Sequence, residues 1–422
     1  MMGLLHACLT LFPVLRICLA FALVLQCFFV LAKDDVRSDS ATIACFRQKG
    51  IPVYHNNSVI VLPSCQLKYS DLFGKIQNAE RYVHLDYFKF QQDSICRQLF
   101  DLLARKAEQG VEVRVIYDYF GNSHSDFPLK DSFLDVYRAR GVKVYAYDKV
   151  KFPWVNHLFH RNHHKIAIID GEFLYTGGMN VADYYIHGKP GVGAWRDTHM
   201  RVTGDAVEGY QMIFVDLWEK VSGERLDASM YEIRHHANDS VLMAVCNRVP
   251  RKSPEIIRET YCTAIDNARS LVQIVNPYPC LFGDVKRALQ RALKRGVKVE
   301  FLVSRRSDGM ANADVTGIEM HRLMKRGADI YYYEGAFHHS KLMMVDGLFC
   351  TIGTANLDAR SLRFDLEVNS YIFDKGVTSE LQDIFESDKS VSMLLTPENW
   401  KELFPLKRKV RARIFMSVKK LL

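Results

Sequence analysis

Hydrophobic and polar residues alternate along most of the chain in two recurring patterns. Residues Leu99–Gln109 place apolar side chains at helical spacing, and Gly110 then follows as a typical helix stop. Val111–Tyr119 alternates between apolar and polar positions as a strand does. Because helices and strands follow one another in this way, the pattern predicts an α/β chain.

The N-terminus has a different pattern, because Leu4–Ala32 is almost uniformly apolar. This length can span a bilayer, so we expect residues 1–32 to be a membrane anchor or a signal segment. Arg16 before the apolar run favours a cytoplasmic N-terminus with the body of the protein outside. The cysteines of the body do not indicate a full disulfide set, and free thiols favour a reducing compartment instead. The sequence therefore predicts attachment to the cell membrane and leaves the sidedness open.

The body of the chain is an internal duplication. Three pairs of similar segments carry it: Ile76–Ala79 with Ile265–Ala268, Arg105–Val113 with Arg291–Val299, and Arg140–Tyr145 with Arg326–Tyr331. Each copy runs as a helix, a strand, a helix that ends at glycine, and a β-branched strand. We expect a first repeat at residues 50–232, a second at 233–405 and a basic tail at 406–422.

Charge and cysteine content narrow the partners without naming them. The formal net charge of +8 favours a polyanionic partner, and a lipid surface and a nucleic acid fit it equally well. The cysteines beyond the apolar N-terminus are odd in number and include no C-x-x-C pair, which indicates neither a zinc site nor a full disulfide set. We expect no metal and no cofactor.

Each copy repeats one chemical motif at one spacing. The motif residues are His163, Lys165, Asp170 and Asn180 in the first copy, and His339, Lys341, Asp346 and Asn356 in the second. A His and a Lys two residues apart on a strand point to the same face, so an imidazole and an ammonium can converge on one ligand. Unrelated domains would not repeat this chemistry, so the pattern favours one active site built from both copies.

These groups are the ones that phosphodiester chemistry needs. One imidazole can attack phosphorus to form a phosphohistidine, and the other can protonate the leaving alkoxide. Lysines and asparagine amides can hold the non-bridging oxygens, so no metal is required. The two imidazoles must start in opposite protonation states. Each also needs an acid that fixes its tautomer, and Asp197 and Glu367 are the candidates.

The motifs resemble those of the phospholipase D superfamily, and within it those of the bacterial cardiolipin synthases. The resemblance covers most of the chain after about residue 50 and rests on Arg161–Gly171, Trp195–His199 and Gly353–Ser361. It implies two tandem α/β/α sandwich repeats, related by a pseudo-two-fold axis, with one active site between them. It also implies that His163 is the nucleophile and His339 the acid and later the base. Asp170 and Asp346 would then be mainly supporting residues, although the residues alone do not rank the two histidines.

The resemblance implies a transferase that moves a phosphatidyl group from phosphatidylglycerol to the headgroup hydroxyl of a second phospholipid. Two alternatives stay open. A phospholipase D would use water in place of that hydroxyl, and a nuclease of the same superfamily would need an open basic groove with stacking aromatic residues. Because both motifs are intact, a non-catalytic scaffold is not favoured. We expect phospholipid substrates and an anionic membrane surface as partners, and no nucleic acid.

Three further features have weaker implications. The tail mixes basic and apolar residues, and is either a basic amphipathic helix on anionic lipid or a solvated final helix. His157, His160 and His164 have no regular spacing, so we do not expect them to bind a metal. Tyr184 and Tyr185 follow Asn180 and are expected to be pocket walls.

Overall fold

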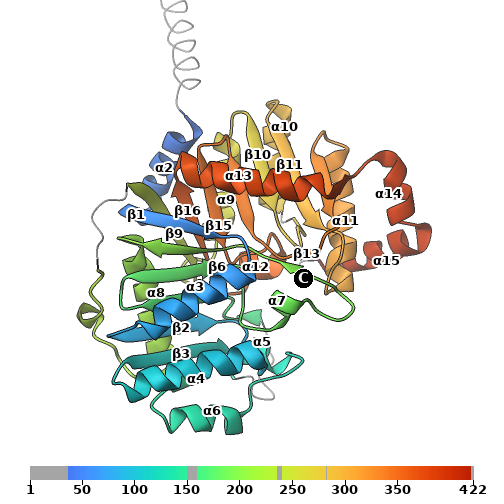
Figure 1. Cartoon of the computed structure of the whole chain (residues 1–422). Coiled ribbons are helices and arrows are strands. Elements are labelled where there is room, and N and C mark those ends of the chain that lie inside the picture. Colours follow the sequence, from blue (N-terminus) through green and yellow to red (C-terminus); the bar gives the residue numbers. More distant parts are fainter. Residues whose placement is uncertain (1–36, 150–158, 235–239, 282, 420–422) are drawn as a thin grey trace, which may run out of the picture.

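The computed structural model describes residues 37–149, 159–234, 240–281 and 283–419 (Figure 1). The apolar segment expected at residues 1–32 and the histidine His157 lie outside the described residues. Within the described ranges, no helix has both the length and the apolar character needed to cross a bilayer.

Strands and helices alternate in the first repeat, which forms the lower, blue-to-green half of Figure 1. Its strands are β1 (Val53–Leu62), β2 (Tyr82–Tyr87), β3 (Glu112–Asp118), β4 (Lys143–Tyr147), β5 (Lys165–Ile169), β6 (Phe173–Gly177), β7 (Trp195–Arg196) and β8 (His199–Thr203). Its helices are α3 (Cys65–Gln77), α4 (Ser94–Glu108), α5 (Tyr119–Ser123), α6 (Asp131–Arg138), α7 (Tyr184–His187) and α8 (Ala206–Ser222), followed by the short η2 (Ala228–Met230). The helix and strand predicted on either side of Gly110 are confirmed as α4 and β3.

The second repeat follows the same plan in the upper, yellow-to-red half of Figure 1. Its strands are β9 (Val241–Arg248), β10 (Leu271–Val275), β11 (Lys298–Ser304), β12 (Asp329–Tyr333), β13 (Phe337–His338), β14 (Leu342–Val345), β15 (Phe349–Gly353), β16 (Glu367–Phe373) and β17 (Ser392–Leu394). Its helices are α9 (Ile256–Asn267), α10 (Gly283–Lys294), α11 (Met310–Met324), α12 (Ala359–Arg363), α13 (Lys375–Ser390) and α14 (Pro397–Leu403). Helix α15 (Leu406–Ser417) follows in the segment expected to be a basic tail. Helix α2 (Ser38–Gln48) precedes β1 and contacts α9.

One sheet of fifteen strands runs through the described part of the chain. The first repeat contributes β1-β8-β6-β5-β2-β3-β4, and the second contributes β9-β16-β15-β14-β10-β11-β12 with β17 at its edge. The two orders correspond strand by strand. They meet where β1 and β9 pair antiparallel, as a two-fold axis between these strands requires. The predicted pair of α/β repeats with pseudo-two-fold symmetry is therefore confirmed, with both repeats joined in one sheet.

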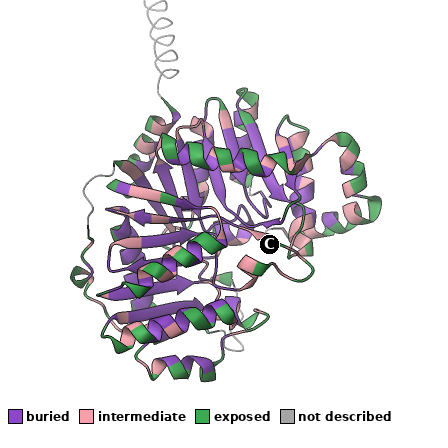
Figure 2. Ribbon diagram, in the orientation of Figure 1, coloured by how far each residue is buried: buried purple, intermediate pink, exposed green. Residues whose placement is uncertain are grey.

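Helices cover both faces of this sheet, and the exposed residues in Figure 2 lie mainly on their outer sides. Helices α3, α4 and α6 pack in one core cluster, and α9, α10 and α11 pack in another. A third cluster contains Trp218 of α8 and Leu381 of α13, so it draws residues from both repeats. The two repeats therefore share a core in addition to a sheet.

Candidate active site

Each motif histidine is held by backbone from the opposite repeat. The His163 amide donates to the Leu366 carbonyl at 2.9 Å, and the His339 amide donates to the Arg196 carbonyl at 2.7 Å. Near His339, β7 and β13 pair in parallel across the repeats. The two motifs are thereby brought to the junction of the repeats, near the label of β13 in Figure 1.

The carboxylates behind the histidines also cross between the repeats. His163 Nδ1 lies 2.9 Å from Glu367 Oε1, and His339 Nδ1 lies 2.7 Å from Asp197 Oδ2. Both carboxylates are buried. The structure thus pairs each histidine with one of the two acids that the sequence suggested. Each acid comes from the repeat that does not supply the histidine.

The charge on these acids fixes the tautomer of each imidazole. Burial alone would raise the pKa of Glu367, but His163 and Lys165 outweigh it and lower the pKa to about 2. His339 and Lys341 likewise hold the pKa of Asp197 below its usual range against the effect of burial. An ionised carboxylate can only accept a hydrogen bond. The Nδ1–H of each neutral imidazole therefore donates, and Nε2 keeps the lone pair that a nucleophile or a base requires.

The protein environment does not separate the protonation states of the two imidazoles. Burial, reinforced by nearby lysines, lowers the pKa of His163 to about 4 and that of His339 to about 3. The described groups therefore shift the pKa of both imidazoles in the same direction, and the opposite starting states stay a prediction for the substrate-bound site. An anionic phosphodiester between them would raise the pKa of both imidazoles, because a nearby negative charge favours the protonated form.

The two motif lysines lie close enough to influence both histidines, so the structure brings the two motifs together. The charges of Lys165 and Lys341 each lower the pKa of both imidazoles. Lys165 Nζ donates to the His163 carbonyl at 2.8 Å, and Lys341 Nζ lies 3.0 Å from His339 Nε2. Burial lowers the pKa of Lys165 to about 7 and that of Lys341 to about 8. A bound phosphate would restore their positive charge.

The motif asparagines are buried beside these groups. Asn180 Nδ2 donates to the Tyr185 hydroxyl at 3.0 Å, and the Tyr185 ring lies 6.2 Å from the His339 ring. The side-chain oxygens of Asn180 and Asn356 find no hydrogen-bond partner in the described part of the chain. Buried polar atoms without partners are uncommon in proteins, so these two amide oxygens are suited to accept a hydrogen bond from a donor on a ligand, such as a hydroxyl.

The motif aspartates lie away from the imidazoles. Asp170 accepts hydrogen bonds from the backbone amides of residues 80–82 at 2.7–2.9 Å. Asp346 accepts from those of residues 269–271 at 2.8–2.9 Å. Each aspartate follows the lysine of its motif by five residues along a strand, roughly 16 Å at strand rise. This position fits the supporting role that the family resemblance implies.

Aromatic residues to which the sequence analysis gave no role surround the imidazoles. The Phe88 ring lies 4.9 Å from the His163 ring, edge to face. Trp195 and Phe337 lie 5.6 and 5.8 Å from the His339 ring. Phe337 precedes His339 by two residues in an extended segment, so the strand period was a signal that could have found it.

The additional histidines near the first motif have other partners. His164 Nδ1 lies 3.1 Å from Asp86, and His160 Nδ1 donates to the Phe364 carbonyl at 3.0 Å. The residues that the structure describes include no group of three His, Cys, Asp or Glu side chains arranged to hold a metal ion.

Comparison with known proteins gives one family. The family described as "Cardiolipin synthase, PLD-like domain" matches residues 72–187 and 261–389. The chain is 33% identical to a cardiolipin synthase of Oceanobacillus iheyensis over 341 residues, which cover 81% of this chain and 70% of that protein. It is 31% identical to cardiolipin synthase 2 of Staphylococcus epidermidis over 383 residues, 88% of this chain and 77% of that one.

A solved structure has the same fold. The phosphatidylserine synthase of Haemophilus influenzae superposes with a TM-score of 0.68 at 13% identity, over 90% of this chain and all of that chain. At this identity the likeness concerns the fold alone.

Proposed function

The chain belongs to the cardiolipin synthase family of phospholipase D-like enzymes, and on this premise we propose that it transfers a phosphatidyl group between two phospholipids. The donor is phosphatidylglycerol, and the acceptor is the headgroup hydroxyl of a second phospholipid. The product is cardiolipin when the acceptor is also phosphatidylglycerol. This proposal rests on two His–carboxylate pairs that each join one repeat to the other, His163 with Glu367 and His339 with Asp197. They give one site two imidazoles with defined tautomers.

In the first step the His163 Nε2 lone pair attacks the donor phosphorus, and the bond from phosphorus to the headgroup glycerol breaks. His339, protonated next to the anionic phosphate, gives its proton to the departing glycerol oxygen. The charges of Lys165 and Lys341 stabilise the non-bridging oxygens as negative charge redistributes. The enzyme then holds a phosphatidyl group on His163.

In the second step the neutral His339 takes the proton from the acceptor hydroxyl. The acceptor oxygen attacks the phosphorus, and the bond between phosphorus and His163 breaks. Both imidazoles return to their starting states, so the cycle consumes no cofactor. Water in place of the acceptor would release phosphatidic acid, so exclusion of water decides between transferase and hydrolase.

We further propose that helix α15 faces an anionic membrane surface. Three apolar residues at intervals of four are exposed along it, Leu406, Val410 and Ile414 at 76, 49 and 63%, and Val418 at the C-cap continues the interval at 44%. The side chains of Lys407 and Arg413 flank this stripe, and the described residues offer neither an ion-pair partner. On the opposite side, Arg408 and Arg411 bind Asp314 of α11. Apolar residues with flanking cations are the pattern of a helix that lies on anionic lipid.

A product assay tests the proposed reaction. Purified full-length protein is incubated with phosphatidylglycerol in mixed micelles, and the lipids are identified by mass spectrometry. We expect cardiolipin and free glycerol, both lost in His163→Ala and retained in the control His55→Ala, an exposed histidine on β1. Phosphatidic acid alone would make the enzyme a hydrolase, and the absence of lipid turnover would contradict the proposal and favour nucleic acid as the substrate.

A further inference from the structure

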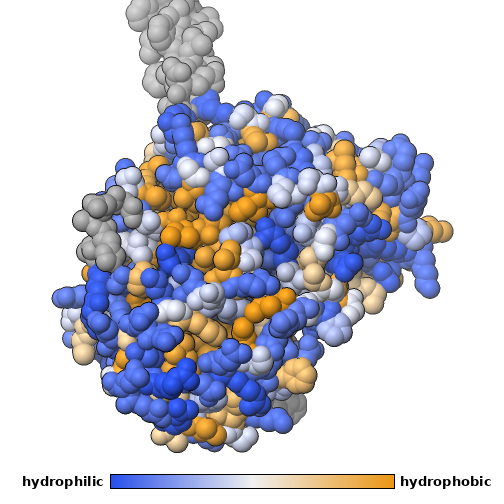
Figure 3. Space-filling model, in the orientation of Figure 1, coloured by the Kyte–Doolittle hydropathy of each residue, from blue (hydrophilic) through white to orange (hydrophobic). Residues whose placement is uncertain are grey.

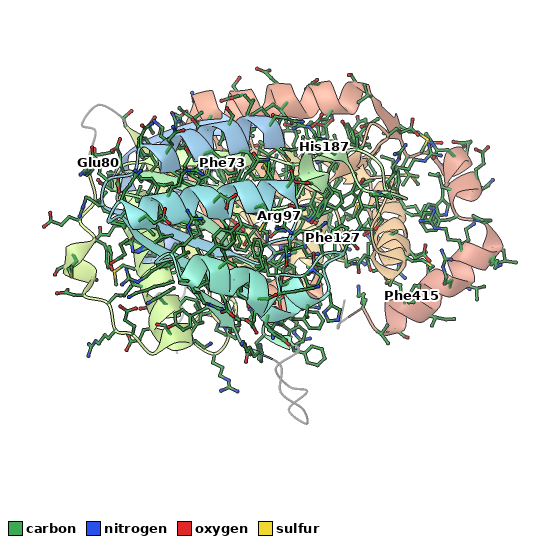
Figure 4. All side chains as sticks on the ribbon, turned by 60° about the horizontal axis from the view of Figure 1, so that its bottom comes forward. Phe73, Glu80, Arg97, Phe127, His187 and Phe415 are labelled. Carbon is green, nitrogen blue, oxygen red and sulfur yellow. The ribbon has the colours of Figure 1, made fainter. Side chains whose placement is uncertain are left out.

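A second group of charged residues lies beside the site and has no part in the mechanism above. Lys89 follows β2, Lys189 follows α7, Asp126 lies between α5 and α6, and Asp308 precedes α11. Figure 4 labels Phe127 and His187, which mark the segments that carry Asp126 and Lys189.

Lys89 is tied to the first motif through its neighbours. Phe88, one residue earlier, contacts the His163 ring at 4.9 Å, and its amide donates to the His164 carbonyl at 3.0 Å. The Lys89 carbonyl accepts from the Val181 amide at 3.2 Å, one residue beyond Asn180. The backbone of Lys89 therefore lies between the proposed nucleophile and a motif asparagine.

Lys189 is linked to the second histidine through an aromatic wall. Lys189 Nζ lies 5.7 Å from the centre of the Tyr184 ring, which is 4.6 Å from the Trp195 ring. Trp195 in turn lies 5.6 Å from the His339 ring. Lys189 also forms an ion pair with Asp126 at 2.8 Å. The Lys89 backbone therefore lies on the His163 side of the site, and Lys189 lies on the His339 side.

One cation of this group, the Lys89 ammonium, has no direct contact with a negative charge among the described residues. The Lys89 ammonium, on a half-buried residue, has neither a hydrogen bond nor an ion pair with any described residue. Burial and the charge of Lys189 lower its pKa, whereas Asp126 and Asp308 raise it. Burial raises the pKa of Asp308, and Lys89, Lys189 and Lys341 oppose that shift. Because Lys341 belongs to the catalytic motif, the group lies within electrostatic reach of the reacting phosphate.

We propose that Lys89, assisted by Lys189, binds the phosphate of the acceptor phospholipid. This inference rests on the proposed transferase function. In the proposed reaction Lys165 and Lys341 bind the phosphate of the donor. The acceptor phospholipid brings a second negative charge, which needs a cation of its own. Water and simple alcohols bring no such charge. A cation at this place therefore favours a phospholipid over water as the acceptor.

A competition between two acceptors tests the site. Full-length protein is given phosphatidylglycerol in mixed micelles with added ethanol, an acceptor without phosphate, and the ratio of cardiolipin to phosphatidylethanol is measured by mass spectrometry. We expect Lys89→Met to lower this ratio about tenfold, because a charge-assisted contact to phosphate is lost. Lys89→Arg, which keeps the charge, should retain most of the ratio. Lys294→Met, at an exposed lysine of α10, should leave it unchanged.

Each outcome decides the matter. A fall of both products in proportion would place Lys89 in the donor site or in the fold, and an unchanged ratio in Lys89→Met would remove it from acceptor binding. Either result overturns the inference while the transferase function stands. Failure of the wild-type protein to form cardiolipin would overturn the proposed function and this inference with it. Thermal melting of each variant separates a lost contact from a lost fold.

Discussion

At His163 and His339, one ring nitrogen is held by a buried carboxylate and the other is left for chemistry. Because each carboxylate contacts only one of the two imidazoles, the two His–carboxylate pairs can be tested one at a time. The pair that serves the nucleophile matters for every substrate. The pair that serves the general acid matters only when the leaving group needs a proton.

Glu367→Gln and Asp197→Asn should separate these roles. Each change allows the wrong imidazole tautomer, so turnover of phosphatidylglycerol should fall about 10²-fold or more in both variants. With a p-nitrophenyl phosphodiester, whose leaving group departs without a proton, Asp197→Asn should recover most of its first-step rate. Glu367→Gln should not. Burst kinetics of p-nitrophenol release measure this, and the reverse pattern would make His339 the nucleophile.

We expect the two motif lysines to set an upper pH limit for activity. Burial lowers the pKa of Lys165 to about 7 and that of Lys341 to about 8. A cation with a lowered pKa loses its charge at lower pH, so kcat/KM for the donor should fall as pH rises above about 8. Lys341→Arg, which stays protonated, should extend the profile to higher pH at reduced absolute activity. A profile flat to about pH 10, the ordinary lysine range, would contradict this assignment.

At the scale of elements, Asp170 and Asp346 tie the ends of β5 and β14 to the starts of the neighbouring strands β2 and β10. Both aspartates have a positive φ, 56° and 53°, at the Asp–Gly turn that follows each motif strand. The repeated carboxylate is therefore explained by the geometry of the sheet. It does not require contact with the substrate.

Asp170→Asn tests this structural role. An amide keeps the size of the side chain but loses the charge that accepts three backbone hydrogen bonds, so we expect a loss of about 1.5–3 kcal/mol in unfolding free energy. Activity per folded molecule should fall far less than in His163→Ala. Urea unfolding followed by circular dichroism, combined with the product assay, measures both quantities. A stable but inactive variant would return Asp170 to the catalytic groups.

We expect helix α15 to contact anionic lipid, and hydrogen exchange can measure this contact. The projection that α14 and α15 form is mostly hydrophilic in Figure 3, and Phe415, labelled in Figure 4, lies on it. Phosphatidylglycerol vesicles should slow hydrogen exchange in α15, and phosphatidylcholine vesicles should do so less, because Lys407 and Arg413 favour anionic lipid. Val410→Asp with Ile414→Asp should abolish the protection, whereas Met212→Asp on α8 should not. Protection without vesicles that rises with protein concentration would indicate a second copy of the chain on this face.

At the scale of the whole molecule, one sheet and one shared core cluster join the repeats. Large chains often unfold domain by domain, but here each repeat packs in part against a core cluster that both repeats share. We therefore expect a single urea transition, with far-UV circular dichroism and tryptophan fluorescence coinciding. Trp218 in the first repeat and Trp400 in the second report on different halves. Two separate transitions would show that the repeats are independent domains.

The sequence by itself determined the duplication and predicted the chemistry. Motif spacing placed His163, Lys165, His339 and Lys341, and the repeated helix–glycine–strand order predicted the two α/β repeats. These features are local, because side-chain type and strand period act over a few residues. The spacing after each motif also drew attention to Asp197 and Glu367, but it did not show which histidine each would meet.

Only the tertiary structure decided which carboxylate pairs with which histidine. Glu367 reaches His163 across 204 residues, and Asp197 reaches His339 across 142. These contacts arise because β1 and β9 join the repeats about a two-fold axis and bring the motif of one repeat to the backbone of the other. The pKa values of the imidazoles were equally beyond the sequence, since burial and the charges of two lysines from different repeats set them. Contacts between residues far apart in the chain depend on how the elements pack, and no local pattern specifies them.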